Sequence, residues 1–209
     1  MVVGSTVAES SWPWAAILLV AVLPVVLTAA TAFAKSSVLL GAVRVGLGAE
    51  ALLSVPVIFA LSVVLTAVVM APVAGDVIGE VERTGGIDGL ASAPPSAWWE
   101  AVEPWRAFLV RHADAAELEM FAQVQGRSTG DPLVVVPAFL ITELREALAM
   151  AVVILVPLVV VDLLVAQATT LLGMTQLQVQ VVSVPCKLLL FLAIDGWNVV
   201  VGGLLAGYR

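Results

Sequence analysis

The sequence has little of the chemistry that most enzymes and metal proteins use. Among its 209 residues there is one cysteine, Cys186, and one histidine, His112. An intrachain disulfide is therefore excluded, and a zinc or iron–sulfur site has no cluster of ligands. A G-x-S-x-G string surrounds Ser128, but a helical pattern precedes it and the histidine lies upstream, so it is no nucleophile elbow. We expect no enzyme activity, no catalytic residue, no metal and no cofactor.

Charge is also scarce. Charged residues make up 12% of the chain, compared with about a quarter in an ordinary soluble domain. Hydrophobic residues make up 61%, and the mean hydropathy is +1.10. The 16 acids and 9 bases give a formal net charge of −7, so no basic patch is available to hold a nucleic-acid backbone. These values exclude a soluble single domain and exclude nucleic acid as a partner.

Long apolar runs are what the sequence does contain. Two of them carry no charge and two carry one each: residues 12–34, 51–75, 147–186 and 188–208. A helix of about 20 residues crosses a hydrocarbon core. The runs therefore predict an all-α, polytopic helical membrane protein. Its segments are an N-terminal tail (1–11), a first hydrophobic hairpin (12–75), an acidic segment (76–131) and a second hairpin (132–209), which turns within residues 173–183.

Prolines interrupt all four apolar runs. They are Pro24, Pro56, Pro157 and Pro185. Proline lacks a backbone N–H and kinks or breaks a helix, so we expect both hairpins to be broken at these residues. Carbonyls freed inside a bilayer need protein or water as partners, which favours a subunit buried among neighbours.

The distribution of charges predicts the topology. Lys35 and Arg44 lie between the first two runs, whereas residues 76–131 contain ten acids and four arginines. By the positive-inside rule, the Lys35 loop is cytoplasmic and the acidic segment extracytoplasmic in a bacterial inner membrane. Glu9 and the absence of Lys or Arg before the first run argue against a cleaved signal peptide. Within the acidic segment, apolar spacings of three and four predict an amphipathic helix over residues 98–120, restarted at Pro104.

Three isolated charges lie in the C-terminal apolar runs: Asp162, Lys187 and Asp195. An unpaired charge at the bilayer centre costs several kcal/mol, so each needs a partner, a polar cavity or an interface. Lys187 and Asp195 are about 12 Å apart along a helix axis, which is too far for a direct pair. Asp162 is therefore the expected counter-ion of Lys187. A structural pair that fixes the hairpin register is favoured over a proton or ion relay, which stays open.

Several strings in the second half resemble those of one family. Leu172-Gly-Met-Thr-Gln, followed by Ser183-Val-Pro-Cys-Lys and then Phe191-Leu-Ala-Ile-Asp-Gly-Trp, is similar to L-G-M-M-M…S-L-P-F-K…F-x-x-x-D-G-W. Pro137-Ala-Phe-Leu-Ile-Thr-Glu143-Leu resembles P-A-(F/Y)-x-x-S-E-L. These are motifs of the R-type export-gate subunits of bacterial type III secretion systems, the FliP/YscR/SctR family, and matching strings extend from about Thr31 to Trp197.

The resemblance implies a structural pore subunit. Members assemble in several copies with S-type and T-type subunits and with other membrane proteins of the type III export apparatus. Together they conduct unfolded protein substrates, and much of the complex lies on the periplasmic side of the lipid bilayer. The resemblance adds Glu143 to the buried charges Asp162, Lys187 and Asp195 as a group expected to serve assembly.

The family's methionine loop aligns with Met174, Thr175, Gln176 and Leu177, of which only Met174 keeps the family residue in the run. The resemblance implies that these four residues form the pore gate, while the sequence alone favours an ordinary solvated cytoplasmic turn. The rival function is a small-solute or ion transporter with Asp162 and Asp195 as carriers. The absence of recognisable internal repeats counts against the rival.

Overall fold

The computed structural model describes residues 12–50, 52–174 and 176–208, and within these ranges the fold is all helical, without a strand. The expected tail of residues 1–11 lies outside the described residues. The ten helices of the described part are α1 (Trp12–Ala29), α2 (Phe33–Leu47), α3 (Val55–Arg83), α4 (Gly86–Ser92), α5 (Pro95–Ala101), α6 (Glu103–His112), α7 (Ala115–Gln125), α8 (Pro132–Leu171), α9 (Val179–Ala193) and α10 (Gly196–Ala206). The predicted all-α class is confirmed.

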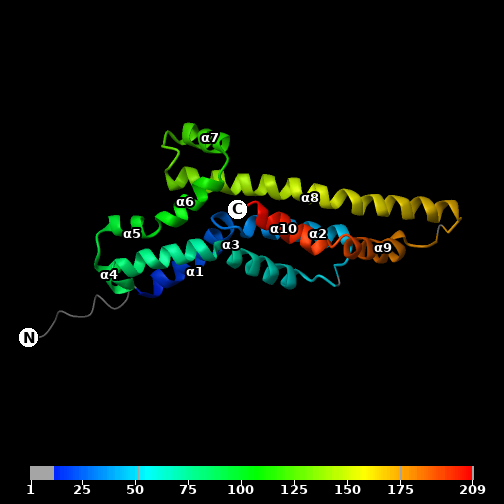
Figure 1. Cartoon of the computed structure of the whole chain (residues 1–209), viewed down its shortest axis with the longest axis horizontal. Coiled ribbons are helices and arrows are strands. Elements are labelled where there is room, and N and C mark those ends of the chain that lie inside the picture. Colours follow the sequence, from blue (N-terminus) through cyan, green and yellow to red (C-terminus); the bar gives the residue numbers. More distant parts are fainter. Residues whose placement is uncertain (1–11, 51, 175, 209) are drawn as a thin grey trace, which may run out of the picture.

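The molecule is elongated, and α8 runs along most of its length (Figure 1). The helix begins where Asp131 accepts a hydrogen bond from the Leu133 amide at 2.9 Å, with Pro132 in its first turn. Its 40 residues span about 60 Å, twice the hydrocarbon core of about 30 Å. The turn after α8 lies at one end of the molecule, and α4, α5 and α7 lie toward the other. α8 is therefore long enough to cross a membrane, and it is also the central helix of the fold.

Two helices of the described part, α3 and α8, are long and apolar enough to cross a membrane. Two further candidates are bent pairs: residues 20–29 with α2, bent by 71°, and α9 with α10, bent by 60°. The chain thus offers two to four spans, compatible with the predicted polytopic membrane protein.

Three of the four prolines do not break a helix, which corrects one detail of the prediction, whereas Pro56 directly follows the break between α2 and α3. Pro24, Pro157 and Pro185 lie inside continuous helices, and Pro56 lies in the first turn of α3. The first bend falls at residues 30–32, where the Trp105 indole N–H donates to the Ala30 carbonyl at 2.9 Å. A tertiary partner thus satisfies a carbonyl at this bend, which the local sequence could not reveal.

The amphipathic helix expected over residues 98–120 is three helices, α5, α6 and α7. Pro104 lies in the first turn of α6, as expected. The unexpected break falls before α7, where the Asp114 side chain accepts a hydrogen bond from the Ala116 amide at 2.8 Å and caps that helix. A capping residue starts a new helix even though the apolar spacing continues through it.

The cytoplasmic loop expected around Lys35 is instead a helix, α2, at the centre of the fold. Nine of its 15 residues are buried, among them Lys35, Leu39, Leu40 and Val43. Arg44 donates through Nε to the Leu53 carbonyl at 2.6 Å. Lys35 is therefore no solvent-exposed loop charge, and the extracytoplasmic position of residues 76–131 stays a prediction.

Two hydrophobic clusters stabilise the fold. The α2 cluster joins α2 and α3 to α8, α9 and α10, and its buried members include Leu39, Leu40, Val43, Leu158, Phe191, Val200 and Leu204. The Phe139 cluster joins the bend after α1 to α6 and α8, and its buried members are Ala30, Phe108, Leu109, Val135 and Phe139. Between α2 and α3, the buried hydroxyls of Ser36 and Thr66 lie 3.3 Å apart.

Candidate functional site

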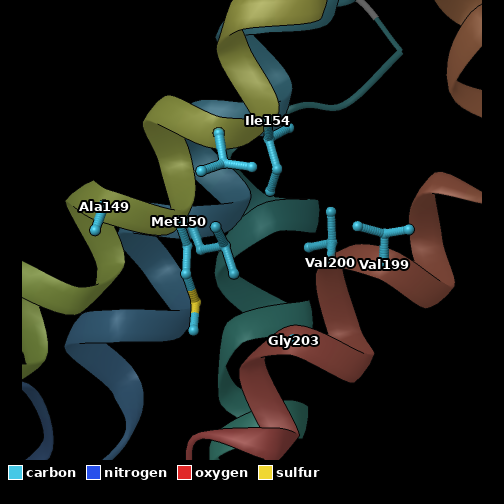
Figure 2. A pocket seen from close by; sticks show the side chains of 8 residues that line it. Ala149, Met150, Ile154, Val199, Val200 and Gly203 are labelled. Carbon is cyan, nitrogen blue, oxygen red and sulfur yellow. The ribbon is translucent and has the colours of Figure 1, made fainter.

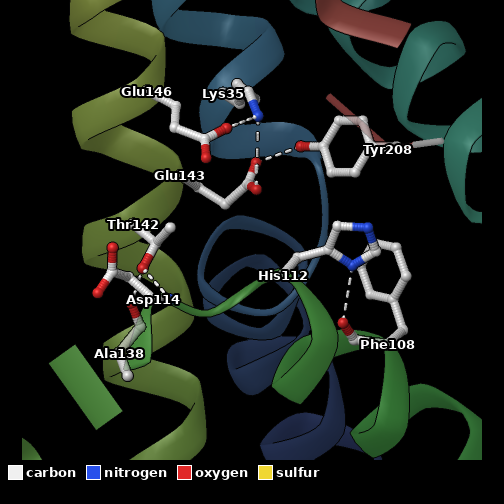
Figure 3. A network of polar contacts seen from close by, with 9 residues as sticks. All are labelled: Lys35, Phe108, His112, Asp114, Ala138, Thr142, Glu143, Glu146 and Tyr208. Carbon is white, nitrogen blue, oxygen red and sulfur yellow. Dashed lines mark hydrogen bonds and ion pairs between the residues drawn. The ribbon is translucent and has the colours of Figure 1, made fainter. Parts of the chain in front are cut away.

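A buried charge cluster lies where α2, α8 and the C-terminus meet (Figure 3). Lys35 is fully buried, and its ammonium lies 3.7 Å from Glu143 Oε1 and also pairs with Glu146. Glu143 is buried as well, whereas the Glu146 side chain is half exposed. Burying a lysine and a carboxylate is tolerated only because they are paired. We call Lys35, Glu143, Glu146 and Tyr208 the Lys35 cluster.

Tyr208, which follows α10, contacts two other members of the Lys35 cluster. Its hydroxyl donates a hydrogen bond to Glu143, and Lys35 Nζ lies 4.6 Å from the centre of its ring. The ring also stacks on Phe108, with centroids 6.1 Å apart. Neither Tyr208 nor the burial of Lys35 is predicted by the sequence, since the partners are more than 60 residues apart in the chain.

A polar cavity of about 360 Å³ adjoins the cluster, lined by Arg111, His112, Ala113, Asp114, Thr142, Glu143, Glu146 and Gly207. The backbone N–H of Asp114 donates to the Thr142 hydroxyl at 2.9 Å. His112 Nδ1 lies 2.8 Å from the Phe108 carbonyl oxygen. Its lining contains positively and negatively charged side chains, and both hydrogen-bond donors and acceptors. The cavity therefore favours no single kind of ligand.

The second charge site is the pair that the sequence predicts. Lys187 Nζ on α9 lies 3.0 Å from both carboxylate oxygens of Asp162 on α8. Glu50, Gln180 and Gly48 line the same polar cavity, whose volume is about 570 Å³. The pairing is present as expected, and it ties the two helices of the second hairpin together. Its role in assembly stays a proposal.

Asp195 lies apart from both sites. It is exposed at the bend between α9 and α10, with a left-handed backbone (φ 51°). Its carbonyl accepts the amides of Asn198 and Val199 at 2.9 and 3.2 Å. Within the described part of the chain its carboxylate forms no ion pair. The structure therefore does not bring Asp195 together with Asp162, as a relay between them would require.

The turn between α8 and α9 extends over residues 172–178 at one end of the molecule (Figure 1). The Gly173 amide donates to the Thr170 carbonyl at 3.1 Å and the Met174 amide to the Thr169 carbonyl at 2.9 Å. With Gly173 at φ 70°, this is a Schellman cap. Met174 and Gln176 are exposed and Leu177 is half buried, while Thr175 lies outside the described residues.

Outside the candidate spans, charged pairs stabilise the polar segment. The Arg106 guanidinium bonds the Glu103 carboxylate and lowers its pKa. Arg127, 2.8 Å from Asp131, and the Leu133 amide lower the pKa of Asp131. In the described residues no group of three or more His, Cys, Asp or Glu side chains could hold a metal ion.

Comparison with known proteins places the chain in a family. The FliP family model matches residues 16–204. The chain is 32% identical over 195 residues to a flagellar biosynthetic protein FliP of Caulobacter vibrioides, covering 89% of this chain and 71% of that protein. It is 30% identical over 204 residues to the hypersensitivity response secretion protein HrcR of Ralstonia nicotianae (91% and 93% covered). It is 28% identical over 200 residues to the Yop proteins translocation protein R of Yersinia pestis (91% and 92% covered). The chain therefore belongs to the FliP family.

Proposed function

We propose that this chain is a structural pore subunit of the inner-membrane export gate of a bacterial type III secretion apparatus, conducting unfolded protein substrates. The match to the FliP family over residues 16–204 supports this, as do relatives named for secretion and translocation. In this proposal the chain assembles in several copies with S-type and T-type subunits and other export-apparatus membrane proteins, and contacts lipid. Its contribution is structural and uses no catalytic residue.

The observation that carries the proposal is the amount of apolar helix surface left uncovered. In the most apolar 18-residue stretch of each helix, 22% of the residues of α3 and 11% of those of α8 are buried. Large side chains along α8, such as Val153, Val156 and Leu164, are more than half exposed. Such surfaces need lipid or neighbouring subunits as cover. A subunit packed among copies and partners accounts for them better than an isolated monomer.

We further propose that Met174, Thr175, Gln176 and Leu177 form the constriction of the pore. The glycine cap presents Met174 and Gln176 at the surface, and glutamine side chains are costly in lipid but favourable beside water. A methionine side chain offers adaptable apolar contact, whereas threonine and glutamine are residue types that can donate and accept hydrogen bonds. The transporter alternative is less well supported, since Asp162 is paired with Lys187 and Asp195 is exposed elsewhere.

Replacing Met174, Thr175 and Gln176 by glycine tests the gate. We expect the assembled complex to remain intact and the leakage of small ions across the membrane to rise. The matched control is the double change Ser128→Gly and Thr129→Gly, in the exposed polar loop between α7 and α8, which should leave leakage unchanged. Unchanged leakage in a fully assembled triple variant contradicts the gate assignment.

A further inference from the structure

Tyr208 connects the two hydrophobic clusters. It packs against the α2 cluster and also against the Phe139 cluster, where its ring stacks on Phe108. Among the described residues it is the one that belongs to both. A residue two positions beyond α10 therefore links α10 to α2, α6 and α8 at one point.

α10 is held in the fold through Val200 and Leu204 of the α2 cluster, but it is not closely packed on α8. α10 packs on α9 and α2, but an apolar slot of about 310 Å³ separates it from α8 (Figure 2). Met150 and Val153 of α8 line one side of this slot, and Val199 and Gly203 of α10 line the other. At its N-terminal end α10 starts from the left-handed Asp195, a conformation that costs a non-glycine residue energy. Packing on α8 alone therefore does not fix the position of α10.

Tyr208 makes three different contacts with residues on three helices. Its hydroxyl donates to Glu143 of α8, its ring lies 4.6 Å from the ammonium of Lys35 of α2, and it stacks on Phe108 of α6. The hydrogen bond to a buried carboxylate is charge-assisted, and a buried lysine over a ring face gains cation–π attraction. Because Lys35 and Glu143 are both buried, these contacts are shielded from water.

We infer that Tyr208 is a positioning residue that holds the α9–α10 unit against α2, α6 and α8. The Lys187–Asp162 pair fixes this unit to α8 near the turn, and Tyr208 fixes it at the opposite end. The position of the α9–α10 unit thus depends on contacts at both of its ends. That a shift of this unit would alter the pore rests on the proposed gate.

Distance measurement between α8 and α10 tests the inference. In a Cys186→Ser background, Val153→Cys and Val199→Cys carry spin labels, and labelled copies are diluted with unlabelled ones in the assembled complex. We expect a single narrow distance distribution with Tyr208, a broader one extended to longer distances in Tyr208→Ala, and an intermediate one in Tyr208→Phe. Phenylalanine keeps the ring contacts but loses the bond to Glu143.

The matched control is Trp99→Ala, an exposed aromatic residue of α5, which should leave the distribution unchanged. An unchanged distribution in assembled Tyr208→Ala overturns the inference. If that variant does not accumulate, Tyr208→Leu, which keeps apolar contact without ring or hydroxyl, gives the same test with the same overturning result. A broadened distribution with unchanged ion leakage supports the positioning role and counts against the gate role of the turn.

Discussion

Lys187 and Asp162 form an ion pair whose two members are unequally buried. The Lys187 side chain is 5% exposed and that of Asp162 is 39% exposed, with Nζ 3.0 Å from the carboxylate. A buried charge that loses its partner keeps its desolvation cost, whereas a half-exposed one regains water. The pair therefore stabilises the α8–α9 hairpin mainly by neutralising the lysine.

The two single substitutions at this pair should not be equivalent. Asp162→Asn leaves a buried lysine without its counter-ion and should lower the thermal unfolding midpoint of the purified protein more than Lys187→Met does. The double variant should be less damaged than the sum of the singles, with a coupling free energy above ~0.5 kcal/mol. Additive single effects would show that the pair contributes nothing as a pair.

The sequence predicts this pair but not the Lys35 cluster, and the reason is physical. Asp162 and Lys187 are isolated charges in apolar runs, so each demands a partner and few partners are available. Lys35 lies at the edge of an apolar run, where a charge is ordinarily solvated. Its burial depends on Glu143, Glu146 and Tyr208, which reach it only through tertiary packing.

Some helix ends can likewise be predicted from the sequence, and others cannot. The glycine after α8 and the proline starting α6 act locally and are readable from the sequence. The bend after α1 depends on the Trp105 indole, 75 residues away, which no local pattern contains. The prolines of α1, α8 and α9 lie inside helices that continue past them, so a residue type that usually ends helices was misleading.

The topology of the acidic segment is testable by labelling. Ser92 and Ser128 are both exposed, and Cys186 is an exposed native thiol that must first be replaced by serine. Cysteines at position 92 or 128 should react with an impermeant maleimide added outside intact cells, because we expect residues 76–131 to be extracytoplasmic. Labelling that requires lysis would reverse the topology.

Two buried serines offer a matched comparison of hydroxyl groups. Among the described residues Ser183 Oγ on α9 is buried without a hydrogen-bond partner, whereas Ser36 Oγ donates to the Phe33 carbonyl at 3.1 Å. Ser183→Ala should leave the unfolding free energy of the isolated chain unchanged or higher, since it removes an unpaired polar group. Ser36→Ala should lower it by about 1 kcal/mol. The reverse order would mean that Ser183 has a partner in solution.

The glycine that ends α8 is required for its backbone angle rather than for space. Gly173 has φ +70°, and a Cβ there would meet nothing within 4 Å. Gly173→Ala should therefore destabilise by ~1 to 2 kcal/mol, the cost of a left-handed L-residue. Gly79 inside α3 has equal space and no such angle, so Gly79→Ala should instead stabilise by ~0.5 to 1 kcal/mol. Thermal unfolding of both purified variants measures the difference, and Gly173→Asn should fall between alanine and glycine because asparagine tolerates this conformation.

Equal shifts for the two alanine variants would mean that the cap does not persist in solution. The residues following it would then lack the fixed geometry that a pore constriction needs.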